Sequence, residues 1–369
     1  MRLRSLRWSS LLVPAVVAVL AAAAPAVEFT RDFAFDADEL VLLNLIGEIR
    51  VAPAPGDRFE VRVAVQGKDA DPDLIAIRLD EGRQARLEVK FPVGSRRDYV
   101  YPRLGSGSRT KIREPGDDEG DRWWKILLGG FGGSGISVRG SGSGLEVWAD
   151  VAVLVPRGRL AEVKLGAGAI ESAGVHGDLK LDVRSGSVRA EDHRGRLVAD
   201  TGSGGVTARG VDGELSIDTG SGAVAVLDHR GGSLHVDTGS GGVEIERTDT
   251  ERLHVDTGSG SVKAVAVRAE RAHIDTGSGA VALELDRLGA GPFVVDTGSG
   301  GVRLVLPADA SAMITVDTGS GGIRADLPDA EILHQGRGEM RLRVGSGDAK
   351  FKVDTGSGGV TITGRKARR

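Results

Sequence analysis

The chain has 369 residues, no cysteine and a formal net charge of −4, and 56 of its residues are glycine. The lack of cysteine excludes a disulfide framework and a lipid anchor attached through an N-terminal cysteine. Without the arginines of residues 1–26 the formal net charge is −7. This acidic balance argues against a polyanion-binding protein, so no nucleic-acid partner is expected.

Residues 1–26 have the features of a secretory signal peptide. Three arginines precede an apolar run from Leu11 to Ala23, and Ala24-Pro25-Ala26 fits a small-residue cleavage site. The apolar run is shorter than the ~20 residues of a membrane span. We therefore expect an exported protein that is periplasmic, associated with the outer envelope or secreted. An uncleaved leader that serves as an anchor is the alternative.

Residues 27–95 are predicted to form an N-terminal β region without the repeat that follows. The stretches Leu40 to Leu45 and Phe59 to Val65 are rich in strand-forming residues, and Pro53-Ala54-Pro55-Gly56 supplies a turn. A stack of strands needs a cap over its first open edge. We expect this region to begin or cap such a stack.

Residues 96–143 are predicted to be a mobile, glycine-rich insert. They combine the acidic cluster Asp117-Asp118-Glu119 with the run from Gly129 to Gly133, a composition that cannot bury a core. Trp123-Trp124 lies inside the insert. In one interpretation these tryptophans form a contact site for a partner or a membrane; in the other they fold back onto the N-terminal sheet.

Residues 144–363 are organised by a repeated phrase, Asp-Thr-Gly-Ser-Gly. Its copies begin at Asp200, Asp218, Asp237, Asp256, Asp275, Asp296, Asp317 and Asp354. Successive starts lie 18, 19, 19, 19, 21, 21 and 37 residues apart, and the last interval holds a degenerate copy at 344–347. Related phrases begin at Lys164 and Asp182. A fixed period of this kind is typical of a repeat architecture.

The residues around each phrase predict strands. In the copy at Asp237, Leu234 and Val236 alternate with His235 and Asp237, so the apolar pair points inward and the polar pair outward. By the same alternation we expect Thr238 and Ser240 to point inward. The pattern predicts an all-β fold: a β-solenoid of about ten coils of 18–21 residues, followed by a basic tail at 364–369.

This arrangement resembles the bacterial putative-adhesin family, a domain family of unknown function. The resemblance rests on the opening segment Leu45 to Val51, on Val155-Pro156-Arg157-Gly158, and on the coils with Ser-Gly-x-Val-x-apolar corners. It covers about residues 38–363, and the insert departs from it. The resemblance implies a single-stranded right-handed β-helix at the cell envelope, with no established activity and no catalytic residues or cofactor to transfer.

Asp-Thr-Gly-Ser is also the active-site phrase of pepsin-like proteases, in which two carboxylates from two lobes face each other. Eight copies that lie one coil apart place the aspartates in one row without an opposing partner, which argues against proteolysis. Neighbouring carboxylates in such a row, ~4.8 Å apart, repel by ~0.9 kcal/mol even in water. Either they accept backbone N–H groups at the corner, which is the favoured account, or the row holds cations.

Three consecutive coils carry histidine two residues before aspartate. The pairs are His235 with Asp237, His254 with Asp256, and His273 with Asp275. Imidazole and carboxylate groups at this spacing are candidate ligands for zinc, copper or nickel. A surface column of mostly neutral histidines, copied by duplication, is the alternative.

The sequence therefore predicts a non-enzymatic envelope protein, an adhesin or an interaction scaffold. Its partner is an unidentified envelope or surface ligand, protein or glycan, and end-to-end self-association is a further expectation. The alternative function is a polysaccharide-active or polysaccharide-binding β-helix. From about residue 160 onward the coils contain no tryptophan or tyrosine, only Phe293 and Phe351, so a groove for sugars has little support.

Overall fold

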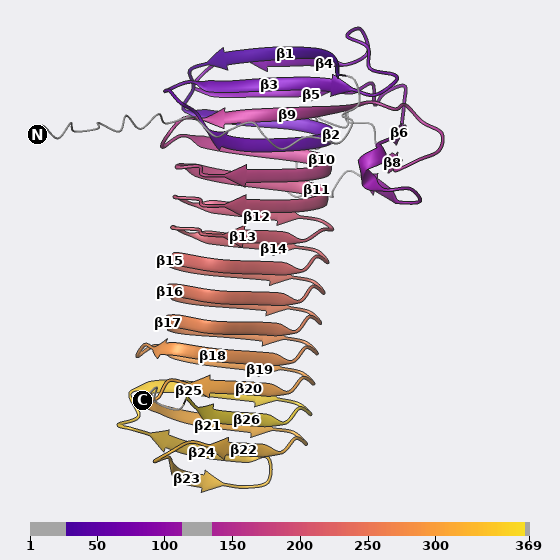
Figure 1. Ribbon diagram of the computed structural model, residues 1–369. Coiled ribbons are helices and arrows are strands. Elements are labelled where there is room, and N and C mark those ends of the chain that lie inside the picture. The colour runs from indigo at the N-terminus through magenta and orange to yellow at the C-terminus, as the bar shows by residue number, and fades with distance from the viewer. Residues whose placement is uncertain (1–26, 113–134, 366–369) are drawn as a thin grey trace, which may run out of the picture.

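The computed structural model describes residues 27–112 and 135–365 (Figure 1). Within these residues every regular element is a strand, apart from one turn of 3-10 helix, η1 (Pro102–Leu104). No helix in the described residues has the length and hydropathy needed to cross a membrane. The predicted all-β, solenoid-like fold is confirmed.

Stacked coils form the body of the molecule, and each coil has one strand position before the corner phrase and one after it. The strands of the coils are β2 (Glu39–Pro53), β10 (Leu160–Ala173), β11 (Asp178–Glu191), β12 (Leu197–Thr201), β13 (Val206–Arg209), β14 (Leu215–Thr219), β15 (Val224–Thr238), β16 (Val243–Thr257), β17 (Val262–Thr276), β18 (Val281–Leu288), β19 (Pro292–Thr297), β20 (Val302–Leu306), β21 (Ala312–Thr318), β22 (Ile323–Asp326), β25 (Ala349–Thr355) and β26 (Val360–Gly364).

The coils pair in parallel, so equivalent residues of the repeat lie side by side. Asp256 of β16, for example, lies beside Asp237 of β15 and Asp275 of β17. The inward-facing residues form the core: Leu234 and Val255 are at most 2% exposed, like their equivalents in most other coils. Alternation along each strand thus separates a continuous apolar interior from the outer faces of the stack of coils.

Glycines at the corner allow successive coils to touch. A Cβ atom on Gly241 would lie 1.7 Å from the carbonyl oxygen of Gly222. The same approach, at 1.6–1.9 Å, recurs through the stack at Gly47, Gly168, Gly186, Gly204, Gly222, Gly241, Gly260, Gly279, Gly300, Gly358 and Gly321. Only the first four of these glycines have a positive φ. In the later coils the corner therefore requires glycine for space and not for its backbone angle.

In most copies the threonine of the phrase fastens this corner. Thr257 Oγ1 accepts the N–H of Gly260 at 3.0 Å and donates to the carbonyl of Gly241, in the preceding coil, at 3.2 Å. The same two bonds recur at Thr219, Thr238, Thr276, Thr297 and Thr355. The prediction that Ser240 also points inward was wrong: β15 ends at Thr238, the alternation stops there, and Ser240 is exposed.

The N-terminal region closes one end of the stack. β5 (Gln84–Lys90) and β9 (Trp148–Val155) pair in parallel with the two halves of β2. β4 (Ala76–Asp80), β3 (Phe59–Gln66) and β1 (Val27–Phe35) add antiparallel strands outside them. Residues 27–95 therefore contain both cap strands and β2, which pairs with β10 as a coil of the stack.

The segment 96–143 contributes a small second sheet beside the first coils. β6 (Asp98–Val100), β7 (Arg109–Ile112) and β8 (Ile136–Arg139) form it, and Tyr99 and Tyr101 are buried. The expectation that this segment buries no core does not hold for its two ends, because the average composition hid these tyrosines among many glycines. Trp123 and Trp124 lie outside the described residues.

The C-terminal coils do not follow chain order. The coil of β25 and β26 lies between the coil of β19 and β20 and the coil of β21 and β22 (Figure 1). The hairpin of β23 (Glu331–Gln335) and β24 (Glu339–Val344) then extends β21 with antiparallel strands. Residues 344–347, predicted as a degenerate copy in a coil of its own, instead link this hairpin to β25. The spacing alone could not reveal this order.

Adjacent glycines of one corner give a test of the close approach. We expect Gly241→Ala to lower stability by about 3 kcal/mol or more, because its Cβ has no room beside the Gly222 carbonyl. Gly242→Ala is the control, since its Cβ would lie 3.6 Å from the nearest atom, the carbonyl oxygen of Ser261. Denaturant unfolding of both variants measures the difference. Equal losses of stability in the two variants would contradict the proposed role of the close approach at Gly241.

Candidate functional site

An unbroken column of aspartates runs along one outer face of the rod. In spatial order its members are Asp182, Asp200, Asp218, Asp237, Asp256, Asp275, Asp296, Asp354 and Asp317, each beside the next. Lys164 stands beside the first member and Glu339 beside the last. We call this column the aspartate ladder. It arises because each aspartate precedes a buried residue of its corner and therefore points outward; that residue is a threonine in every member except Asp182, which Val183 follows.

The hydrogen bonds at the corner differ from those expected. The favoured account had each carboxylate accepting backbone N–H groups, but the threonine hydroxyl accepts them, as Thr257 does from Gly260. Within the described residues, no backbone N–H is bonded to the side chain of Asp237, Asp256 or Asp275. At these three positions the carboxylates therefore face water and one another.

Burial and neighbouring charges make parts of the ladder harder to ionise. Burial, and then Asp237, raise the pKa of Asp218. Burial, followed by Asp296 and Asp256, raises the pKa of Asp275. Because the folded-state pKa of these two aspartates is raised, their ionisation destabilises the fold, and this penalty is relieved as pH falls through the raised pKa. Asp354 differs, because Lys352 Nζ lies 2.5 Å from its Oδ2.

The three predicted histidine–aspartate pairs do lie together. The rings of His235 and His254 stack with centroids 4.7 Å apart and planes 9° apart, and those of His254 and His273 stack at 5.1 Å and 8°. All three histidines are half-buried. Burial, and then the two neighbouring imidazoles, lower the pKa of His254. In the neutral form the rings pack face to face and lie beside the aspartate ladder.

This stacking does not by itself create a metal centre. Among the described residues no three histidine, aspartate or glutamate side chains gather where they could hold one metal ion. Stacked imidazoles share their faces, whereas a metal needs ring nitrogens that converge on a common point. Metal binding by His235, His254, His273 and their aspartates stays a prediction.

The opposite corner carries charges of alternating sign. Arg194, Asp212, Arg230, Asp249 and Arg268 lie side by side in that order. In the adjacent row the Nε of Arg247 lies 2.6 Å from Asp228 Oδ1. Because the coils stack in register, like charges are neighbours on the aspartate ladder, whereas opposite charges are neighbours at the opposite corner. The two sides of the rod therefore differ strongly in electrostatic potential.

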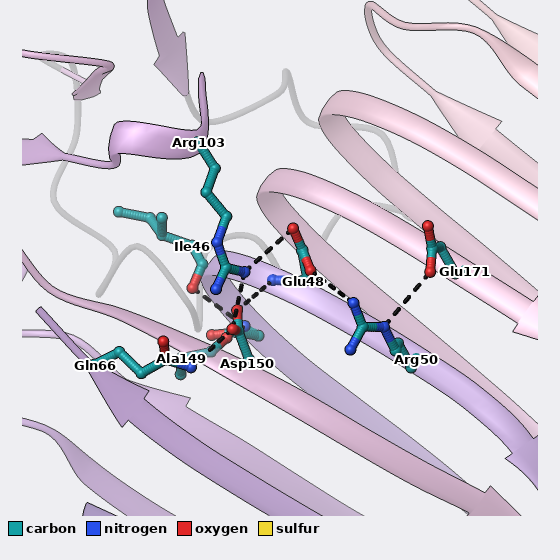
Figure 2. Close-up of polar contacts among 9 residues, drawn as sticks. Ile46, Glu48, Arg50, Gln66, Arg103, Ala149, Asp150 and Glu171 are labelled. Atoms are coloured by element: carbon teal, nitrogen blue, oxygen red, sulfur yellow. Dashed lines mark hydrogen bonds and ion pairs between the residues drawn. The ribbon is translucent and has the colours of Figure 1, made fainter. Parts of the chain in front are cut away.

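A polar cluster that the sequence did not reveal joins the insert to the first coil (Figure 2). Arg103, in η1, reaches Asp150 at 2.9 Å and Glu48 at 3.1 Å. Asp150 also accepts the backbone N–H of Glu48 at 3.0 Å and the side-chain amide of Gln66 at 2.8 Å. The Arg103 guanidinium lies 5.9 Å from the ring centre of Trp148.

The Arg103 cluster is a clamp rather than a reaction centre. Every carboxylate oxygen in it has a donor. Arg103 reaches both carboxylates and so holds η1 against β2 and β9, while Arg50, Gln66 and the backbone N–H of Glu48 supply the other donors. Burial, and then the charges of Asp150 and Glu48, raise the pKa of Tyr101 next to it, so its hydroxyl stays protonated. Its members are dispersed along the chain, and no local motif connects them.

Two further histidines are buried inside the stack and were not singled out from the sequence. His193 Nε2 lies 3.2 Å from the carbonyl of Arg196, and His229 Nε2 lies 3.0 Å from that of Gly213. The Nδ1 atoms of both lack a partner. Burial lowers the pKa of both, so they are neutral core residues rather than ligands.

Comparison with known proteins places the repeats in a family. The model of the Toastrack DUF4097 family matches residues 148–363, which confirms the resemblance inferred from the sequence. No curated protein sequence matches the chain. A crystal structure described as a putative cell adhesion protein from Clostridium sporogenes is 10% identical, with 91% of this chain and 99% of that chain covered and a TM-score of 0.23. At this TM-score the likeness supports no conclusion.

The ladder predicts an unusual effect of neutralising a charge. Asp256→Asn removes repulsion from both Asp237 and Asp275, so we expect it to raise stability on the order of 1 kcal/mol at low ionic strength. The gain should shrink as salt screens the ladder. Asp228→Asn is the matched control and should lower stability slightly, because Asp228 pairs with Arg247. Denaturant midpoints at low and high salt measure both, and a destabilised Asp256→Asn would contradict the repulsive ladder.

The buried histidines predict acid sensitivity. Their pKa values lie below that of an unfolded histidine, about 6.5, so the unfolded chain binds protons that the folded chain does not. Their stabilising effect is complete above pH 6.5 and is lost as pH falls toward the folded pKa. We expect the unfolding midpoint to decrease over that window, and less steeply in His229→Gln than in the exposed control His334→Gln. Identical pH slopes for the two variants would contradict this assignment.

Proposed function

We propose, from the premise that the chain belongs to the Toastrack DUF4097 family, that this protein is a non-enzymatic adhesin or interaction scaffold of the cell envelope. The family carries no assigned activity, so the argument rests on the surface of the rod. The observation that carries it is the arrangement of exposed polar groups in rows, with one member per coil.

Rows of this kind suit an extended partner. The aspartate ladder repeats a carboxylate at each coil, ~4.8 Å apart, along the length of the rod. A small substrate would contact two or three of these groups, whereas a polymer or the surface of another protein can contact many at once. Many weak contacts along one row give strong binding when they form together. The ladder, including Asp237, Asp256 and Asp275, is the proposed contact face.

The same geometry argues against the enzymatic alternatives. A protease of the aspartic type needs two carboxylates that face each other across a cleft, and the ladder has all its carboxylates on one side. A polysaccharide-cleaving groove commonly offers exposed aromatic platforms. Phe293 and Phe351 are buried and stack on each other with ring centroids 4.7 Å apart, so neither is available to a sugar.

The sequence of residues 1–26 supports the proposed location. The charged start, apolar run and Ala24-Pro25-Ala26 site of residues 1–26 favour a cleaved leader. We place the mature chain in the periplasm, at the outer envelope or outside the cell. An anchor formed by an uncleaved leader would keep the same rod on the membrane surface.

Binding without turnover tests the proposal. We expect the chain to be retained by one of three envelope fractions, namely cell-wall polymer, outer-surface glycan or envelope protein, without releasing soluble fragments. The triple variant Asp237→Asn, Asp256→Asn, Asp275→Asn should lose retention, because it removes adjacent contacts on the ladder. The matched control Asp212→Asn, Asp249→Asn alters the opposite corner and should bind normally. Release of reducing sugar ends, or equal retention of both variants, would contradict the proposal.

A further inference from the structure

The last coil of the chain occupies a slot between two coils that precede it. β25 lies between β19 and β21, and β26 lies between β20 and β22. Residues 307–326 must therefore leave a gap beyond β20 for residues 349–364 to fill. The inserted coil buries apolar side chains on entry: Phe351, Val353, Val360 and Ile362 are at most 2% exposed.

This slot is specific for its own coil. Phe351 stacks on Phe293 with ring centroids 4.7 Å apart and planes 17° apart. The equivalent residue is Ala272 in the coil before and Ile314 in the coil after, so this aromatic pair forms only here. Beyond β26, Arg365 pairs with Glu284 and Asp286 of β18. The slot therefore distinguishes residues 349–365 from the other copies of the repeat.

The far wall of the slot keeps its strand pairing but lacks the threonine side-chain bond found at most other coil interfaces. Thr318 does not bond the preceding coil; its hydroxyl donates to Gly321, within its own coil, at 2.7 Å. Ile323 and Ala325 of β22 are partly exposed, although the equivalent Val360 and Ile362 of β26 are fully buried. Their exposure follows from the position of β22, which pairs with β26 alone and so forms an outer edge of the stack. The coil of β21 and β22 therefore has fewer neighbours than the inner coils, and in that respect it is the easiest to displace from the last coil.

A short polar segment connects the last coil to the hairpin. Gly345 and Gly347 have φ of 59° and 83°, so the turn depends on glycine on both sides of Ser346. Side-chain bonds at Ser311 hold it: Ser311 Oγ lies 2.8 Å from both Ser346 Oγ and Asp348 Oδ2. This surface segment can serve as a hinge, because it carries no core side chain.

We propose that the last coil exchanges between two copies of the chain, so that residues 349–364 of each copy fill the slot of the other. The contacts in the exchanged dimer are the same as those in the single chain, so the exchange requires no new complementary surface. Release without exchange would leave strand edges open on both sides of the slot and expose the apolar side chains of β25 and β26. The occupant of an opened slot is therefore the coil of a second copy.

The absence of cysteine from the chain allows a direct test with single substitutions. Asp296 and Asp354 are neighbours in register, at a spacing suited to a disulfide. Chains with Asp296→Cys and differently tagged chains with Asp354→Cys are refolded together at increasing concentration and then oxidised. We expect a mixed disulfide between the two tags. Asp237→Cys mixed with Asp354→Cys is the control for random collision, since Asp237 lies several coils from the slot.

A locked chain provides the second arm. Oxidation of the double variant Asp296→Cys, Asp354→Cys within one chain ties the last coil into its own slot, so this variant should stay monomeric during storage at concentrations where the unsubstituted chain forms a dimer. A mixed disulfide several-fold above the collision control, together with a monomeric locked variant, supports the exchange. Equal yields in the two mixtures, or dimers formed equally by the locked variant, would overturn it.

Discussion

The rest of the structure depends on the contact between backbones at the glycine corner. Backbone hydrogen bonds fix the separation of stacked strands at ~4.8 Å, and at the corner the turning chain brings one coil even closer to the carbonyl of the next. At Gly260 a Cβ atom would lie 1.8 Å from the oxygen of Gly241. No side chain fits there, so the polar groups of the corner must be satisfied by a neighbour. The buried threonine satisfies them, and its position forces the preceding aspartate outward.

The same stacking rule gives two different surfaces. Where the corner phrase is repeated without change, identical charges meet, as Asp237, Asp256 and Asp275 do on the ladder. Where the sequence varies between coils, Asp212 meets Arg230 and Arg230 meets Asp249. Repulsion on the ladder is tolerable because the carboxylates are mostly exposed and water screens them. The aspartate ladder thus follows from the structure of the corner, and it is also the face that we propose as the contact face.

The sequence predicted what depends on local periodicity and missed what depends on long-range contact. Alternation placed Leu234 and Val236 in the core and His235 and Asp237 outside, as the structure has them. It failed at Ser240, because a corner ends the period on which the inference relied. The Arg103 clamp was beyond reach, since Arg103, Glu48 and Asp150 come from separate parts of the chain and have no common spacing.

Coil order poses a different problem, because the corner phrase is the same in every copy and cannot select a neighbour. The residues at the core positions can select a neighbouring coil, because they differ between coils. Phe293 is the first aromatic residue at a position that earlier coils fill with leucine or alanine, and it packs between Ala272 on one side and Phe351 on the other. The small Ala272 gives it room, and Phe351 provides an aromatic face that Ile314 could not. Side-chain volume along one inward row thus specifies an order that the repeat leaves open, which makes the last coil the preferred neighbour of β19.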